Sequence, residues 1–252
     1  LASRRDFLKT TPFKNGCVSF FHPHMQQAML TYAMSCGVKV YRGAMATSIT
    51  PSEKPKISFV HEGKSSELSA NLIVGADGSL SMIRKWANIE SEADNKESFI
   101  TAALVKNLQG IDIDKNPYGF WTNATTGITT IWIRLHQLNG ERYARLYSCY
   151  PFDGIGLKGK DDFNKMLDLI NHTGRKEPLV SSCDLCGPLF SHVSATIRAK
   201  KANVQGVALV GDSFMKPDPI WGQGMAMALY GASILAKNLK ENSRWDEALE
   251  NY

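Results

Sequence analysis

The stretch that decides the fold runs Leu72-Ile73-Val74-Gly75-Ala76-Asp77-Gly78-Ser79-Leu80-Ser81-Met82-Ile83-Arg84. Its first three residues form a short, fully apolar strand, which is typical of a sheet covered on both faces. The carboxyl end of such a strand opens into the crevice where α/β sheets bind ligands. Glycines there let the backbone turn sharply and approach a ligand. We therefore predict a buried strand at 72–74, a helix at 81–87, and the carboxylate of Asp77 free at the mouth of a site.

A second stretch has the same order of features. Val207-Ala208-Leu209-Val210-Gly211-Asp212-Ser213 gives a buried strand, a glycine and an acid, and the chain continues through Pro217-Asp218-Pro219-Ile220-Trp221-Gly222-Gln223-Gly224-Met225. We expect Asp212 to accept hydrogen bonds from sugar or ribityl hydroxyls. Gly222 and Gly224 open a helix predicted at 224–240. Its unpaired N–H groups and the positive end of its dipole favour a delocalised anion, such as the pyrimidine end of a reduced flavin.

The two stretches resemble the second and third FAD-binding fingerprints of flavoprotein monooxygenases, namely the Gly-Ala-Asp-Gly motif and the Gly-Asp motif with its Pro-x-x-Gly-Gln-Gly loop. The resemblance also includes residues 21–26 and 245–252, and it covers nearly the whole chain. It implies an α/β fold: an incomplete FAD-binding domain of the glutathione-reductase type, like that of para-hydroxybenzoate hydroxylase, with an inserted antiparallel β-rich substrate domain. The implied boundaries are 1–97 and 196–252 for the two parts of the FAD-binding domain, and 98–195 for the substrate domain.

The resemblance also implies an activity, that of an FAD-dependent monooxygenase or oxidoreductase. Such an enzyme would use NAD(P)H and O2 on a small organic molecule. Asp212 would bind the ribityl or ribose region, and Pro219 would lie near the reactive edge of the flavin. No catalytic residue and no metal ligand is assigned. The implied cofactor-binding residues are Gly75, Asp77, Gly78, Arg84, Gly211, Asp212, Pro219, Gly222, Gln223, Gly224 and Met225.

Three features depart from the family pattern. The amino-terminal strand-GxGxxG-helix unit, which holds the ADP part of FAD, is absent from this sequence, so we expect the chain by itself to hold FAD weakly. Pro23 and His24 stand where many hydroxylases carry an arginine, and Phe214 and Met215 are bulkier than usual. Two alternatives therefore stay open: a flavin-dependent reductase on the same scaffold, and a degenerate, cofactor-free binding module.

The remaining pattern predicts the other elements. A helix is expected at 25–36, with an apolar stripe and Gly37 as its stop. Strands are expected at 38–42, 46–50, 56–61 and 67–70. Strands of an antiparallel sheet are expected at 101–105, 119–122, 128–135 and 142–150, followed by a helix at 161–171 and a loop and strand at 181–194. The aromatic residues of this sheet could line a substrate pocket, but sheet core is the favoured interpretation. They are Phe120, Trp121, Trp132, Tyr143, Tyr147 and Tyr150.

Composition restricts the function classes. The chain has 252 residues, of which 43% are hydrophobic and 21% charged, with a formal net charge of +5. Lys and Arg are dispersed among Asp and Glu, so we expect no nucleic-acid surface. No apolar run is long enough to span a bilayer. The five cysteines indicate reduced thiols in the cytoplasm rather than a disulfide framework. The twin-arginine pattern at 3–9 lacks the apolar segment that export needs.

Two further motifs are weak. Gly154-Ile155-Gly156-Leu157-Lys158-Gly159 matches GxGxxG literally, but Asp161 and Asp162 at the start of the next helix would repel a pyrophosphate, so we predict a flexible loop. Cys183-Asp184-Leu185-Cys186 could be half a zinc site or a redox pair. No second CxxC accompanies it, and His192 alone does not complete four ligands.

Overall fold

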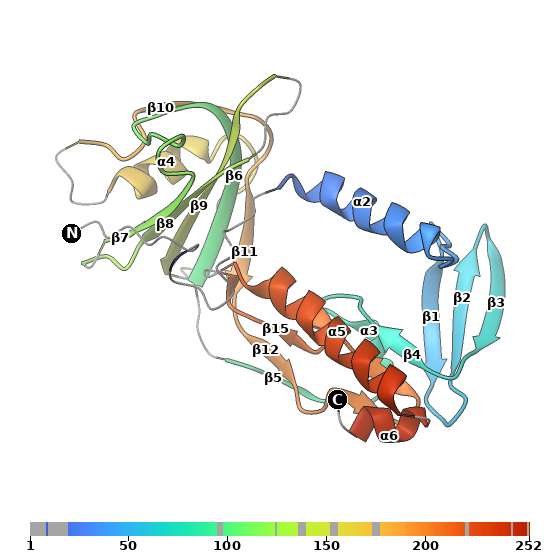
Figure 1. Ribbon diagram of the computed structural model, residues 1–252. Helices are drawn as coiled ribbons and strands as arrows, with labels where there is room; N and C mark the ends of the chain where they lie inside the picture. The colour runs from blue at the N-terminus through green and yellow to red at the C-terminus, as the bar shows by residue number, and fades with distance from the viewer. Residues whose placement is uncertain are drawn as a thin grey trace. The chain divides into compact units, whose positions relative to one another are not determined.

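A computed structural model describes residue 9 and residues 20–94, 98–123, 125–135, 140–151, 156–172, 177–219, 222–242, 244–250 and 252. The chain divides into two units (Figure 1). Unit 1 comprises Leu1–Lys39 and Thr101–His192, and unit 2 comprises Val40–Ile100 and Val193–Tyr252. The divisions near residues 100 and 192 lie within three residues of the domain boundaries implied by the sequence. The larger difference is at the amino-terminal end, because residues up to Lys39 group with the β-rich unit.

Unit 1 is built on an antiparallel sheet with the strand order β10-β6-β9-β8-β7, and β11 also pairs with β6. The strands are β6 (Ser98–Gln109), β7 (Tyr118–Thr122), β8 (Thr129–Arg134), β9 (Tyr143–Pro151), β10 (Ser182–Leu185) and β11 (Phe190–Ser194). Burial alternates along β9, where Ala144 and Leu146 are buried between half-buried neighbours. This period of two places one face of the sheet in the core. The predicted antiparallel sheet is confirmed.

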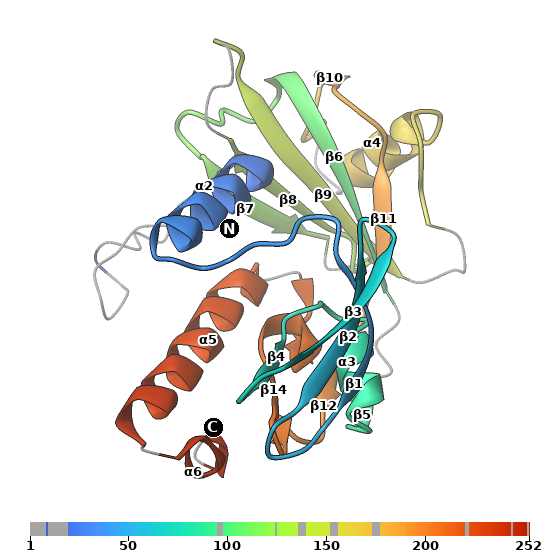
Figure 2. The ribbon, with the colours of Figure 1, turned by 90° about the vertical axis from the view of Figure 1, so that its right-hand side faces the viewer.

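Helix α4 (Phe163–Asn171) belongs to the same unit and contacts β9 (Figure 2). Its Met166 and Ile170 are fully buried, four residues apart on one helical face. The predicted helix at 161–171 is therefore confirmed, beginning two residues later. Helix α2 (His22–Ser35) also forms as predicted and ends before Gly37, whose φ is +89°. The predicted apolar stripe is not packed, because none of the residues of α2 is buried.

Unit 2 contains the two strands from the deciding stretches. β4 (Ile73–Gly75) and β14 (Val207–Leu209) pair in parallel, and β13 (Asn203–Val204) pairs with β14 on its other side. Helix α3 (Met82–Trp86) follows β4, and α5 (Gly224–Glu241) and α6 (Trp245–Glu250) follow β14. Ile73, Val207 and Leu209 belong to the main core of the unit. Ala208 instead packs with Leu235 of α5, so the sheet is covered on both faces at β14.

Two smaller sheets complete unit 2. One is the antiparallel sheet β1 (Met45–Thr50), β2 (Lys56–His61) and β3 (Lys64–Ser69); the three strands were predicted, but their pairing was not, and β3 begins three residues earlier than predicted. The other joins β15 (Met215–Lys216), β12 (Ile197–Ala199) and β5 (Ser91–Ala93), which the sequence did not predict, because strands of two or three residues give no periodic signal. The strand predicted at 38–42 is wrong. Val38 and Tyr41 are exposed, and no strand of the described chain pairs with this segment.

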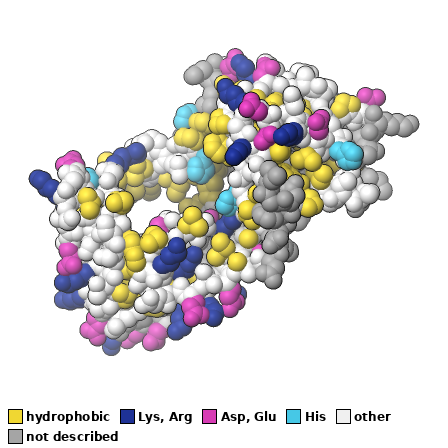
Figure 3. Space-filling model, turned by 180° about the vertical axis from the view of Figure 1, so that it is seen from behind, with side chains coloured by type: hydrophobic (Ala, Val, Ile, Leu, Met, Phe, Trp, Pro, Cys, Tyr) yellow, Lys and Arg dark blue, Asp and Glu magenta, His cyan; other side chains and the backbone are white. Residues whose placement is uncertain are grey.

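On the face shown in Figure 3, Lys and Arg side chains lie interspersed with Asp and Glu rather than in a patch of one sign. No helix within the described ranges has both the length and the apolar character required to cross a membrane.

Candidate functional site

The two deciding stretches lie side by side. β4 and β14 are parallel and in register, with Ile73 opposite Val207 and Gly75 opposite Leu209. The pairing continues past the strands, since the backbone N–H of Val210 donates to the carbonyl of Gly75 at 2.9 Å. Parallel neighbours end at the same edge of a sheet. The chain therefore delivers the segment after Gly75 and the segment after Val210 to one edge, as the sequence predicted.

Arg84 fastens these two segments to each other. Its side chain is only 5% exposed. Nη1 donates to the carbonyl of Ser213 at 2.7 Å, and Nη2 donates to the carbonyl of Ser79 at 2.9 Å. Both acceptors are backbone groups of the protein. Arg84 thus has a structural role in holding the site together.

Ser213 makes a second tie that the sequence analysis missed. Its buried hydroxyl lies within hydrogen-bond distance of the carbonyls of Gly75, at 2.6 Å, and Val210, at 2.7 Å. A small hydroxyl directly after the Gly-Asp pair was the available signal. Because a buried hydroxyl needs hydrogen-bond partners inside the protein, Ser213 links the ends of the two strands.

The carboxylate of Asp77 is not free, contrary to our expectation. It accepts hydrogen bonds from the hydroxyl of Ser81 at 2.5 Å, and from the backbone N–H groups of Met82 at 2.7 Å and Ile83 at 3.0 Å. These N–H groups belong to the first turn of α3, which has no intrahelical acceptors for them. A carboxylate also interacts favourably with the positive end of the helix dipole. Asp77 therefore anchors the start of α3, and Ser81 caps the same helix through Arg84 N–H.

The glycines of the two motifs have different roles. A Cβ placed on Gly75 would lie 2.8 Å from Cγ2 of Ile83 and 2.9 Å from Cδ2 of Leu209, so this glycine permits close packing of α3 on the strands. Gly78 and Gly211 both have positive φ, at +82° and +61°, a conformation that residues with a Cβ rarely adopt. We predicted that glycines here let the backbone approach a ligand. That is not the reason for a glycine at position 75, because Gly75 packs against Ile83 and Leu209.

Asp212 differs from Asp77. It is partly buried, and among the residues that the structure describes no group donates a hydrogen bond to its carboxylate. The start of α5 lies beside it, because a Cβ placed on Gly224 would be 3.8 Å from Oδ1 of Asp212. The available carboxylate is thus adjacent to a helix amino terminus.

The described residues next to the start of α5, Pro219 and Gly222–Gln223, do not cap the helix. Gly222 has a φ of +62°, nothing lies within 4 Å of the position of its Cβ, and its N–H donates to the carbonyl of Pro219 at 3.0 Å. Gln223 is the N-cap residue, but its side chain makes no capping hydrogen bond. The first N–H groups of α5, including that of Met225, therefore have no intrahelical acceptor. The structure thus places Gly224 beside Asp212 and links Gly222 to Pro219, while the roles of these residues toward FAD stay predictions.

Lys216 is a second residue that sequence reasoning missed. It is 8% exposed, and its Nζ donates to the carbonyl of Val193 at 3.3 Å. Burial lowers the pKa of this ammonium, and the negative charges of Asp212, Asp218 and Asp94 oppose that shift. A lone lysine between a methionine and a proline gives no signal in sequence. In the fold it places a positive charge beneath the Gly-Asp loop.

Comparisons with known proteins match both halves of this arrangement. The family model of the FAD binding domain matches residues 19–131, and the model of squalene epoxidase matches residues 190–250. A solved structure of aklavinone-11 hydroxylase in complex with FAD and aklavinone is similar over 86% of this chain and 40% of that chain, with 17% identity and a TM-score of 0.66. Residues 19–131 therefore resemble an FAD-binding domain, and the chain has the fold of FAD-binding flavoenzymes.

Other similar proteins have names that denote different reactions. Digeranylgeranylglycerophospholipid reductase 1 of Methanococcoides burtonii is 24% identical over 78% of this chain and 46% of the relative. A flavin-dependent brominase has a similar fold, with a TM-score of 0.73 at 14% identity, over 90% of this chain and 58% of that chain. The chain thus spans about half the length of the reductase that it matches.

The described part of the literal GxGxxG makes contacts within the protein. Gly154 and Ile155 lie outside the described residues. In the described remainder, Leu157 N–H donates to the Tyr150 hydroxyl at 3.2 Å, and Lys158 N–H donates to the carboxylate of Asp162 at 3.1 Å. Gly159 forms a bridge to Leu189. In the described part of the loop, the N–H groups of Leu157 and Lys158 are thus bonded within the protein and are not available to a phosphate.

The cysteine pair gives thiols of low reactivity. Cys183 and Cys186 are free, and burial raises the pKa of the Cys183 thiol to about 11. Within the described residues no group of three or more His, Cys, Asp or Glu side chains could hold a metal ion. The aromatic residues of the same sheet divide between two environments: Tyr150 is buried core, whereas Phe120 is 53% exposed.

Proposed function

We propose that this chain supplies the carboxyl-terminal part of an FAD site and the substrate domain of an NAD(P)H-dependent oxidoreductase that acts on a small organic molecule. One observation carries the proposal: the carboxylate of Asp212, which accepts no hydrogen bond from the described residues, lies beside the start of α5, at the edge where β4 and β14 end. The family match makes FAD the cofactor to place there.

The residues present fit FAD. Asp212 would accept hydrogen bonds from hydroxyl groups of the ribityl or ribose region. Gly222 and Gly224 leave room that a side chain would fill, and the N–H groups at the start of α5 would face the pyrimidine part of the flavin. Asp77 and Arg84 would act indirectly, by holding the two strand ends in place. Bound FAD would supply the redox chemistry, and the protein supplies orientation and electrostatics.

The experiment measures FAD retention by the full native protein that contains this chain. Asp212→Ala should lower FAD affinity by about 10- to 150-fold, which corresponds to the loss of one hydrogen bond to a charged group, worth about 1.5–3 kcal/mol. The matched control is Asp168→Asn, which changes an exposed acid on α4. A protein that takes up no FAD, or an Asp212→Ala variant that binds FAD as the native protein does, would refute the proposal.

Two reactions are compatible with this site. Hydroxylation with O2 follows the resemblance to aromatic hydroxylases, and their fold supports it. Reduction of an organic substrate, such as an isoprenoid phospholipid, is the second candidate, because matches among curated relatives are digeranylgeranylglycerophospholipid reductases. Substrate-dependent NAD(P)H oxidation under anaerobic conditions separates them, since a reductase continues without O2 and a monooxygenase stops. NADH and NADPH are compared in the same assay.

A further inference from the structure

Arg145 has no partner in the part of the chain that the structure describes. It lies in β9, and no side chain or backbone group accepts a hydrogen bond from its guanidinium or forms an ion pair with it. The residue is nevertheless half-buried. Partial burial removes water from a charged group, and proteins normally compensate by pairing the charge. A half-buried guanidinium without such a partner is available to pair with an anionic ligand.

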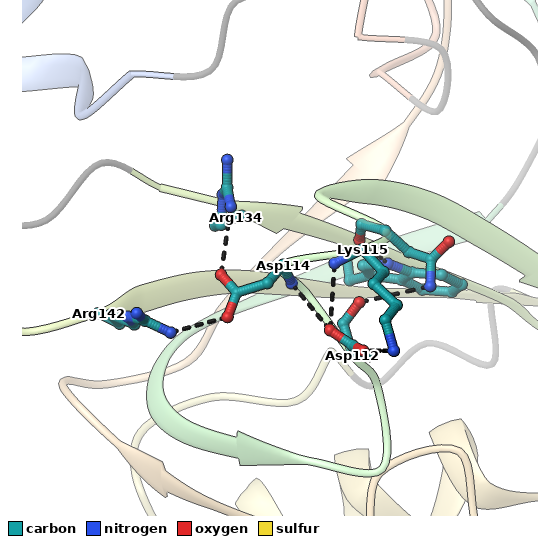
Figure 4. A network of polar contacts seen from close by, with 7 residues as sticks. Asp112, Asp114, Lys115, Arg134 and Arg142 are labelled. Carbon is teal, nitrogen blue, oxygen red and sulfur yellow. Dashed lines mark hydrogen bonds and ion pairs between the residues drawn. The ribbon is translucent and has the colours of Figure 1, made fainter.

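Two arginines of the same sheet show the contrast (Figure 4). Arg134 and Arg142 both bind the carboxylate of Asp114, at 3.2 and 2.7 Å. Their side chains are 43% and 61% exposed, so water alone could solvate them. These two arginines thus have an acidic partner, whereas Arg145 has none among the described residues. Arg134 is paired with Ala144, whose side chain lies on the opposite face from that of Arg145.

The residues opposite Arg145 on the β8 and β7 side are apolar or aromatic. The antiparallel register places Ile133 of β8 opposite Arg145, and Tyr118 of β7 opposite Ile133. Directly paired residues share one face of a sheet. Tyr118, Ile133 and Arg145 therefore form one row across three strands.

The next row on the same face is also apolar. Phe120 of β7 lies opposite Ile131 of β8, which lies opposite Tyr147 of β9. Ile131 is buried, while Phe120 and Tyr118 are 53% and 37% exposed, so the two rows present aromatic surface at the β7 edge. Contiguous apolar surface of this kind marks a place where a ligand or partner can bind.

The charge of Arg145 reaches into this environment. Burial raises the pKa of the Tyr147 phenol, and the nearby positive charge of Arg145 opposes that rise. A site that desolvates a tyrosine also strengthens the attraction between a guanidinium and an anion, because the local dielectric constant is low.

We propose that Arg145 binds the negatively charged group of an organic ligand, whose apolar body lies along the two rows from β9 to β7. A guanidinium matches the planar oxygens of a carboxylate, or those of a phosphate, with two parallel hydrogen bonds. The sheet therefore selects an amphiphilic organic anion over a neutral molecule of the same shape. That this ligand is the enzyme's substrate rests on the proposed function; the binding itself does not.

The test uses two probes of similar shape, naphthoate and the neutral naphthalenemethanol, with calorimetric titration of the full native protein. Naphthoate should bind at least about tenfold more tightly than the alcohol. Arg145→Gln should remove that preference, and Arg145→Lys should keep part of it. Arg142→Gln is the matched control, because Arg142 is paired with Asp114, and it should retain the preference. Thermal melts confirm that each variant is folded.

Equal binding of the two probes overturns the inference, and so does a preference that survives Arg145→Gln or disappears in Arg142→Gln. FAD content is measured on the same samples. A protein that binds FAD but shows no anion preference refutes only the role of Arg145. A protein that takes up no FAD but prefers naphthoate through Arg145 refutes the proposed function and leaves the anion site in place.

Discussion

Replacing Arg84 with methionine should destabilise the protein strongly. Methionine fills much of the same space but donates no hydrogen bond, so the carbonyls of Ser213 and Ser79 lose their donor. A hydrogen bond to a charged group contributes about 1.5–3 kcal/mol. The bond to Ser79 is only part-buried, so we expect a loss of about 3–4 kcal/mol in the free energy of unfolding. For a protein of this size, that lowers Tm by about 6–16 °C.

Thermal melts and urea titrations followed by circular dichroism measure this loss. Lys85→Met is the matched control, because Lys85 is the exposed neighbour of Arg84 on the same helix and both variants introduce a methionine. Surface changes of this kind alter stability by no more than about 0.5 kcal/mol. If Arg84→Met and Lys85→Met melt together near the native temperature, Arg84 does not fasten the two strand ends, and the site lacks its main structural tie.

Three further outcomes are expected. Gly75→Ala should lower the free energy of unfolding, measured by urea titration, by about 1–3 kcal/mol, because the added Cβ would overlap two side chains. The control is Gly224→Ala, whose Cβ would meet nothing closer than 3.8 Å and which should leave this free energy unchanged. Equal losses in the two variants would contradict the packing role of Gly75. Asp77→Ala should lower the free energy of unfolding by about 1–2 kcal/mol through the loss of its contacts at α3, so an unchanged urea midpoint would contradict that role. At pH 8 only roughly a thousandth of Cys183 is thiolate, given its pKa of about 11. Iodoacetamide should therefore label exposed Cys36 before Cys183, as followed by mass spectrometry. Early labelling of Cys183 would refute the raised pKa.

The pKa of Cys183 also gives a direction for stability. The thiol binds its proton more tightly in the folded state than in the unfolded state, whose ordinary value is 9.0. The unfolded state therefore loses this proton first as pH rises from 9.0 to about 11, and the free energy of unfolding falls across that window. Cys183→Ala should flatten this part of the stability profile. An unchanged slope would mean that burial does not shift the thiol.

Sequence predicted the elements whose pattern is local. The antiparallel strands of unit 1, helix α5 and the strands β4 and β14 all have periodic or continuous apolar runs, and all are confirmed. The sheet β5-β12-β15 was missed because tertiary pairing, rather than residue type, makes such short segments extended. The strand predicted at 38–42 has apolar residues, but no strand of the described chain pairs with it, and a strand without hydrogen-bond partners is not formed.

The two aspartates show why the candidate site could be predicted only in part. Asp77 and Asp212 occupy similar places in the sequence, at the ends of adjacent strands. Asp77 comes two residues after Gly75, and Asp212 comes directly after Gly211. Their roles diverge because the next helix begins at a different distance along the chain. The helix after Asp77 begins five residues later, so its first N–H groups reach back to that carboxylate. The helix after Asp212 begins twelve residues later, beyond a loop that returns it beside the carboxylate without a hydrogen bond to it.

That difference separates the two kinds of variant. Asp77→Ala removes the carboxylate that accepts three hydrogen bonds, so it should lower the free energy of unfolding. It should reduce the amount of bound FAD only to the extent that less of the protein is folded. Asp212→Ala removes no hydrogen bond within the described protein, so it should leave the melting temperature nearly unchanged while FAD affinity falls. In this variant the Lys216 ammonium would lose one of the three negative charges that act on it, and those of Asp94 and Asp218 would remain. If Asp212→Ala instead unfolds the protein, this carboxylate is structural as well, and the edge of the parallel strands offers a flavin no available acid.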